Sequence, residues 1–142
     1  MYDRGQGVPQ NYAEAVKWYR KAADQGEALA QSTLGFMYAK GQGVPQNYAE
    51  AVRWFRKAAD QGNARAQRNL GFMYANGQGV PRDYVQAHKW SNLAASRFPA
   101  SDKENRDKAV KNRDIMAAKM TPAQIAEAQK LAREWKPKPE GK

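Results

Sequence analysis

The residue types that carry most enzyme and metal chemistry are scarce in this chain. Among its 142 residues there is one histidine, His88, and no cysteine. A chain without cysteine has no disulfide, thiol nucleophile or thiolate zinc site. A single histidine cannot form a multi-histidine metal site. The sequence therefore predicts no metal and no cofactor, and it leaves the redox compartment open.

The remaining candidates for acid, base or nucleophile also favour a structural interpretation. Glu14 and Glu50 each follow an asparagine by three residues, which is typical of a helix capping box and predicts that their oxygens accept from backbone donors. None of the serines is followed by lysine three residues later, as a Ser-x-x-Lys nucleophile requires; those considered are Ser32, Ser91, Ser96 and Ser101. We therefore expect a protein that is not an enzyme.

A Gly-Gln-Gly sequence occurs three times, beginning at Gly5, Gly41 and Gly77. Glycine-rich loops that bind phosphate follow a strand, open a helix and contain further glycines or a lysine. Here each copy lies between two helical patterns, so we interpret it as a turn where glycine supplies a positive φ.

The elements that must position these residues belong to a repeat of 36 residues. Residues 5–40 and 41–76 differ at only seven positions, and a third, more divergent copy begins at Gly77. A period in the thirties is the signature of helix-turn-helix solenoids, whose units bury their apolar faces only by stacking. The apolar spacing predicts two helices in each unit. One begins after Asn11, Asn47 or Asp83, and the other spans about 28–39 or 64–75.

These motifs resemble the Sel1-like repeat family, relatives of tetratricopeptide repeats, over residues 1 to about 95. The matching positions are Ala30, Leu34-Gly35, Tyr38, Gly41, Gly43-Val44, Ala51, Trp54, Ala58-Ala59 and Gly62. The resemblance implies an all-α fold, a right-handed α/α superhelical solenoid. It also implies an adaptor for protein complexes, often in a bacterial envelope or signalling setting. In relatives, the helix corresponding to 28–39 lines the concave groove.

The pattern changes toward the C-terminus. His88 stands where the second copy has Val52, and Arg97-Phe98-Pro99 replaces Gln61-Gly62-Asn63. Ser101 with Glu104, and Thr121 with Pro122, predict the starts of two capping helices. We therefore expect repeats over 1–100, capping helices over 101–135 and a flexible tail over 136–142. Because Met1-Tyr2 aligns with Met37-Tyr38, the first repeat is expected to be truncated at its N-terminus.

Differences between the sister repeats predict a binding strip on one face of helix 28–39 and of helix 64–75. At 100° per residue, positions 29, 32, 33, 36 and 40 share an arc, and all but 36 change in the next copy. Phenylalanine at 36 and 72 is retained on this face, and aromatic residues and arginine are typical of interface hot spots. The predicted partner-binding residues are Leu29, Thr33, Phe36, Arg65, Arg68, Asn69 and Phe72.

The net charge of +10 favours an acidic partner, and residues 38–74 hold six basic residues against two acidic ones. We expect a scaffold that binds a protein or peptide. One alternative is an anionic polymer such as nucleic acid, although no recognised nucleic-acid motif accompanies the charge. Another is the β-lactam binding or hydrolysis linked to cysteine-rich relatives, which the missing cysteines disfavour.

No apolar run is long enough to span a membrane. The sequence does not determine the compartment, although the resemblance is compatible with a periplasmic or secreted protein. It does not determine the oligomeric state either.

Overall fold

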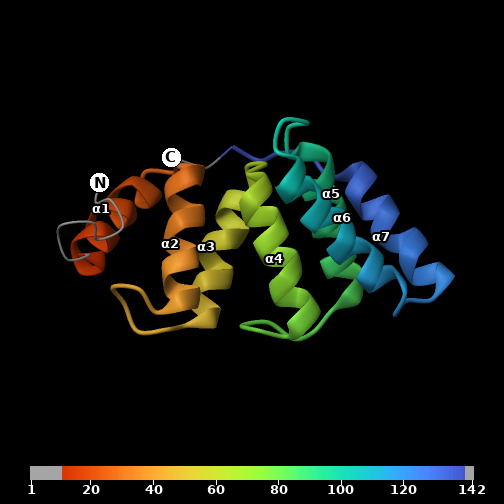
Figure 1. Cartoon of the computed structure of the whole chain (residues 1–142), viewed down its shortest axis with the longest axis horizontal. Helices are drawn as coiled ribbons and strands as arrows, with labels where there is room; N and C mark the ends of the chain where they lie inside the picture. The colour runs from red at the N-terminus through yellow and green to blue at the C-terminus, as the bar shows by residue number, and fades with distance from the viewer. Residues whose placement is uncertain (1–10, 140–142) are drawn as a thin grey trace.

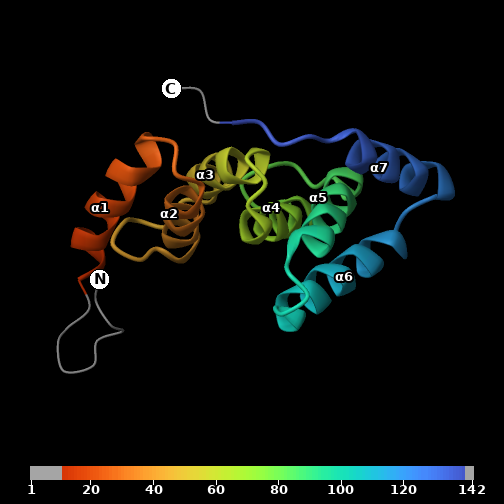
Figure 2. The same ribbon diagram turned by 90° about the horizontal axis from the view of Figure 1, so that it is seen from above.

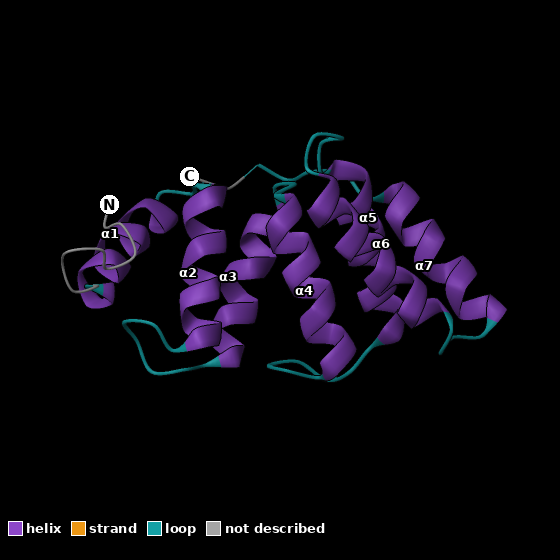
Figure 3. Cartoon of the chain, in the orientation of Figure 1, coloured by secondary structure: helices purple, strands orange, loops and turns teal. Residues whose placement is uncertain are grey.

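The computed structural model describes residues 11–139, and this part of the chain contains seven α-helices and no strand (Figures 1 and 3). The helices are α1 (Tyr12–Asp24), α2 (Ala28–Lys40), α3 (Tyr48–Asp60), α4 (Ala64–Asn76), α5 (Tyr84–Arg97), α6 (Lys103–Ala117) and α7 (Pro122–Glu134). The Gly-Gln-Gly sequences that begin at Gly41 and Gly77 join helices, as predicted, and each of these two glycines has a positive φ. The copy at 5–7 lies outside the described residues.

The helices form an elongated array in which each helix from α1 to α5 packs against the next one in sequence, whereas α7 packs against α5 (Figure 1). Contacts between α4 and α6 and between α5 and α7 add a second level of packing. Viewed from above, α2, α4 and α6 lie on one side of the array, and α3, α5 and α7 lie on the other (Figure 2). The predicted all-α repeat solenoid is confirmed.

Two glycines inside helices let consecutive helices approach closely. A Cβ added at Gly35 of α2 would lie 2.8 Å from the ring of Phe55 on α3. At the equivalent Gly71 of α4, it would lie 2.9 Å from Ser91 Oγ and 3.1 Å from the carbonyl oxygen of Ala87 on α5. Glycine at these two positions therefore allows α2 to approach α3 closely, and α4 to approach α5.

Buried glutamines fix the helix pairs in a way that the sequence pattern did not indicate. Gln31 and Gln67 are fully buried at equivalent positions, and their Nε2 atoms donate to the carbonyl oxygens of Ala23 and Ala59, each at 3.1 Å. Gln61 Nε2 donates to Gln31 Oε1 at 2.9 Å. These bonds tie each helix of the α2 type to the helix before it, and they tie one repeat to the next.

The helix starts are partly as predicted. Asn11, Asn47 and Asp83 accept from the backbone N–H three residues later. The prediction that the carboxylates of Glu14 and Glu50 accept from backbone donors at the helix start is wrong. Glu14 Oε2 instead accepts from the Trp18 indole at 3.2 Å, and Glu50 pairs with Arg53 at 3.1 Å. Side-chain partners one turn further along the helix are better placed than the cap backbone.

The C-terminal helices correct two further details. The N-cap of α6 is Asp102 rather than Ser101, because the Asp102 carboxylate accepts from the backbone N–H of Asn105. The i,i+4 spacing of charges within this helix also predicts the ion pairs Glu104–Lys108 and Asp107–Lys111. In the structure Asp107 instead pairs with Lys103, whose Nζ lies 2.7 Å from Asp107 Oδ2. The predicted Glu104–Lys108 pair is present, at 3.4 Å.

The end of the described chain folds back on the repeats. After α7, Trp135 packs edge-on against Trp90 of α5, with ring centroids 6.4 Å apart. The backbone N–H of Lys138 donates to the carbonyl oxygen of Asp60 at the end of α3. Figure 2 shows this segment running back across the array from α7 toward its N-terminal half. No helix in the described part of the chain is long and apolar enough to cross a membrane.

Candidate partner-binding site

All seven residues of the predicted strip lie on α2 or α4, on the side of the array that also carries α6. Three of them are large apolar side chains that remain exposed: Leu29 at 71%, Phe36 at 43% and Phe72 at 51%. Arg65 is exposed as well, and Thr33, Arg68 and Asn69 are half-buried. The opposite faces of the two helices hold Ala30, Leu34 and Met37 and their counterparts in the core.

The strip contains two adjacent cavities. The first, between α2 and α4, has a volume of about 360 Å³ and is lined by Leu29, Ser32, Thr33, Phe36, Asn63, Arg65, Arg68 and Asn69. The second, between α4 and α6, has a volume of about 290 Å³ and is lined by Arg68, Asn69, Phe72, Lys108, Lys111 and Asn112. Because Arg68 and Asn69 line both cavities, all seven predicted residues belong to one continuous surface.

Several lining residues were not selected from the sequence. Ser32 was recognised as a variable position, yet its small side chain gave no reason to choose it. Lys108, Lys111 and Asn112 come from α6, which lies outside the 36-residue period, so repeat comparison could not place them. A count of basic residues in α6 was the one signal available, and it did not indicate which helix α6 would pack against.

Arg68 has a polar environment built by the N-terminus of α6. Its Nη1 donates to Asn105 Oδ1 at 2.6 Å, and Asn105 Nδ2 donates to Asp102 Oδ2 at 2.9 Å. Burial lowers the pKa of the Arg68 guanidinium, and Arg65 lowers it further, while Asp102 and Glu104 oppose the shift. The hydrogen bond from Asn105 is the main reason that the pKa of Asp102 lies below its usual value.

The cationic groups of the first cavity are not neutralised by close ion pairs. Among residues 11–139, no carboxylate lies within 4.0 Å of the guanidinium of Arg65 or Arg68. On the apolar side of the cavity, the ammonium of Lys40 lies 5.6 Å from the centroid of the Phe36 ring. The cavity therefore joins a wall from α2, which carries Leu29 and Phe36 beside two hydroxyl residues, to a cationic wall from α4.

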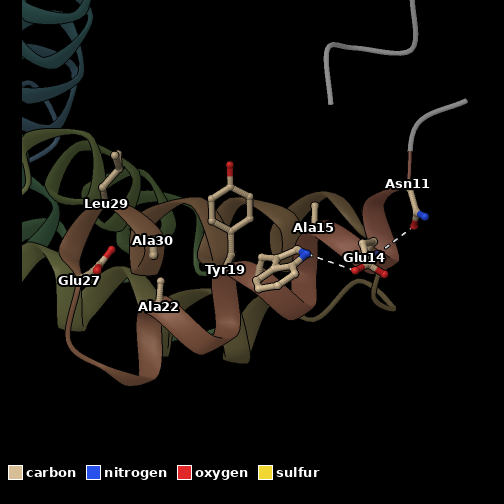
Figure 4. A pocket seen from close by; sticks show the side chains of 9 residues that line it. Asn11, Glu14, Ala15, Tyr19, Ala22, Glu27, Leu29 and Ala30 are labelled. Atoms are coloured by element: carbon tan, nitrogen blue, oxygen red, sulfur yellow. Dashed lines mark hydrogen bonds between the residues drawn. The ribbon is translucent and has the colours of Figure 1, made fainter. Parts of the chain in front are cut away.

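The larger hollow of about 660 Å³ on α1 and α2 shares only Leu29 with the strip (Figure 4). It is lined by Asn11, Glu14, Ala15, Trp18, Tyr19, Ala22, Glu27, Leu29 and Ala30. Trp18 is 62% exposed there, whereas Trp54, at the same repeat position in α3, is 3% exposed. The face of α3 that corresponds to this face of α1 packs against α2. In the described structure no helix covers the face of α1, and the hollow lies there.

His88 is buried on α5, away from both cavities of the strip. Burial lowers the pKa of its imidazole; Arg113 lowers the pKa further, and Asp114 opposes the shift. No group of His, Cys, Asp and Glu in the described part of the chain is arranged to hold a metal ion. His88 is buried at the repeat position that Val52 occupies in α3, as expected from their alignment.

Comparison with known proteins identifies the repeat. The family model for the Sel1 repeat matches residues 1–27, 28–63 and 64–97. One similar solved structure is c5321, described as a protective antigen present in uropathogenic Escherichia coli strains and displaying an SLR fold. It has a TM-score of 0.81 and 37% identity over 91% of this chain. Another is a Sel1 repeat protein from Oxalobacter formigenes, with a TM-score of 0.64 and 36% identity over 92% of the chain.

The matched region is only part of each of these proteins. It covers 27% of the Escherichia coli chain and 58% of the Oxalobacter chain. A comparison with curated protein sequences gave no significant match. The three matches to the family model span more than half of the sequence and fall on the repeats that the 36-residue period defines. The chain belongs to the Sel1 repeat family.

Proposed function

We propose that this protein is a non-enzymatic scaffold that binds a segment of a protein partner along the strip on α2 and α4. Sel1 repeat proteins generally act as scaffolds for protein interactions. The observation that carries the proposal for this chain is the pair of exposed phenylalanines, Phe36 and Phe72, at equivalent positions beside the two cavities.

Burial of these side chains by a partner is the physical source of affinity. Removing apolar surface from water contributes about 25 cal/mol per Å², and interfaces concentrate this contribution in a few aromatic and arginine residues. The strip places two phenylalanines and a leucine next to two arginines. This combination resembles the centre of a protein interface more than an ordinary solvated surface.

The test is a selection of peptide binders from a random twelve-residue phage-displayed library, followed by affinity measurements on synthetic copies. For the double variant Phe36→Ala/Phe72→Ala we expect a loss of affinity of about tenfold or more, since each truncation removes a hot-spot side chain. Because both side chains are exposed, the urea unfolding midpoint should stay close to that of the wild type.

The matched control is Trp18→Ala, which truncates an exposed aromatic residue outside the strip. We expect this variant to retain the affinity of the wild type. If the selected peptides bind the double variant as tightly as the wild type, the strip is not the binding surface. A double variant that loses stability while it retains binding would likewise show that the phenylalanines serve the fold.

A further inference from the structure

We propose that the cavity between α2 and α4 is a carboxylate-binding site that receives an aspartate or glutamate side chain of the partner segment. This inference rests on the proposed function and specifies its chemistry. The carboxylate would lie against Arg65 and Arg68, and the neighbouring apolar residue of the segment would lie against Leu29 and Phe36.

The first argument is the origin of the two cavity walls. At the positions where the first repeat has Leu29 and Ser32, the second repeat has Arg65 and Arg68. Stacking of the repeats places both pairs on one cavity. Two guanidiniums therefore face a half-enclosed space, and each raises the electrostatic energy of the other, because like charges repel. A bound anion would relieve this repulsion.

The second argument is a buried hydroxyl. Ser32 lines the cavity and is 2% exposed, and its Oγ has no hydrogen-bond partner among residues 11–139. Buried polar groups are normally paired, so a buried hydroxyl at the wall of a cavity needs an explanation. A carboxylate oxygen in the cavity would accept a hydrogen bond from it.

The third argument is the helix terminus at the cavity. Asn63, the N-cap of α4, lines the space, and the first turn of α4 contains no acidic residue. The N-terminus of a helix carries a partial positive charge, which favours an anion within about one turn. Without the arginines and the buried hydroxyl, this feature would not indicate a site. With them, the arginines, the hydroxyl and the helix terminus all favour an anion.

The surroundings favour a single negative charge over a phosphate. Asp102 and Glu104 both act on the Arg68 guanidinium, and Arg68 already donates one hydrogen bond to Asn105. A dianionic phosphate would meet this negative potential more strongly than a carboxylate does. The strip also continues past Arg68 to Phe72, beside Lys108 and Lys111 of α6. A bound segment therefore extends in both directions, which favours a side-chain carboxylate over a chain terminus.

The experiment uses the peptides selected on the wild-type protein. We expect aspartate or glutamate next to an aromatic or aliphatic residue in most of them. Replacing that acidic residue by its amide should weaken binding about tenfold or more, the scale of a lost hydrogen bond to a charged group. Arg65→Gln and Arg68→Gln should remove most of the preference for acid over amide, and Ser32→Ala should reduce it.

Arg133→Gln is the matched control, because it makes the same change in charge at an exposed site on α7. It should leave both affinity and acid preference unchanged. Arg65 is exposed, so Arg65→Gln should fold even if loss of the Arg68–Asn105 bond destabilises Arg68→Gln. Circular dichroism and urea midpoints confirm folding of each variant.

The outcomes separate the two proposals. Peptides that lose affinity in Phe36→Ala/Phe72→Ala but show no acid preference would overturn the carboxylate site and leave the binding strip standing. Phosphoserine in place of the acidic residue, if bound at least tenfold more tightly, would assign the cavity to a phosphoryl group. Tighter binding of a single-stranded oligonucleotide would also overturn the carboxylate assignment. A selection that yields no binder counts against both proposals.

Discussion

His88 shows how one substitution within a repeat changes the behaviour of the fold. It occupies on α5 the position of Val16 on α1 and Val52 on α3, and all three side chains are buried. Because burial and Arg113 lower its pKa in the folded state, the unfolded chain, with a pKa of about 6.5, binds the proton more readily. Above about pH 6.5 the imidazole is neutral in both states and the pKa difference costs no stability. As the pH falls below about 6.5, the unfolded chain takes up the proton first, and the folded state loses stability relative to it.

We therefore predict that His88→Val, which restores the sister residue, removes this acid sensitivity. Urea midpoints of the wild type and the variant, measured at pH 7.5 and pH 5, check the prediction. The wild type should lose more stability than the variant between the two values. Parallel shifts in the two proteins would show that other groups control the acid response.

The residues of the candidate site were only partly accessible from the sequence. Leu29 and Arg65 were found because repeats of the same fold differ at positions that packing does not constrain, and these two residues occupy one such position. Asn63 was missed because it precedes the helical positions that were compared; in the structure it caps α4 and lines the cavity. Lys108 was missed because contacts between α4 and α6 depend on tertiary packing, which no repeat period encodes.

At the scale of helices, capping explains both the successes and the errors. Asn11 and Asn47 cap their helices as predicted, since a single short side chain reaches the backbone N–H three residues later. The reciprocal bond needs a longer side chain with no better partner, and Trp18 competes for Glu14. In the described chain, both halves of the box are present at Thr121 and Gln124 of α7.

We predict that Thr121→Ala destabilises the protein by about 1 kcal/mol, the usual effect of losing an N-cap side chain. The reason is local, because Thr121 Oγ1 accepts from the Gln124 backbone N–H at 3.1 Å. Thr121→Ser keeps the hydroxyl and should retain most of the stability. Amide exchange along α7 is the measurement, and it should accelerate in the alanine variant alone. Equal protection in both variants would mean that the packing of α7 against α5 holds the helix without its cap.

At the scale of the whole molecule, the array determines what each residue contributes. The 36-residue period was sufficient to predict which helices stack, because each repeat contacts chiefly its neighbours. It was not sufficient to predict the path after α7, where Trp135 packs on Trp90 and Lys138 meets Asp60. Those contacts join segments that no periodic pattern relates.

The tryptophans at positions 18 and 54 test this dependence on the array. They occupy the same repeat position, but Trp54 is enclosed by α1 and α2, whereas Trp18 lines the open hollow on α1 and α2. Truncating a buried tryptophan costs about 3–5 kcal/mol, since it removes apolar contacts and leaves a cavity. We therefore predict a loss of that size for Trp54→Ala and of less than about 1 kcal/mol for Trp18→Ala.

Urea unfolding of the two variants measures the difference, and amide exchange locates it. Trp54→Ala should accelerate exchange in α1, α2 and α3 together, because its side chain joins the three helices. The effect of Trp18→Ala should remain within α1. If the two variants lost equal stability, the contribution of this residue would be local to its own helix, and stacking of the repeats would not be what stabilises the array.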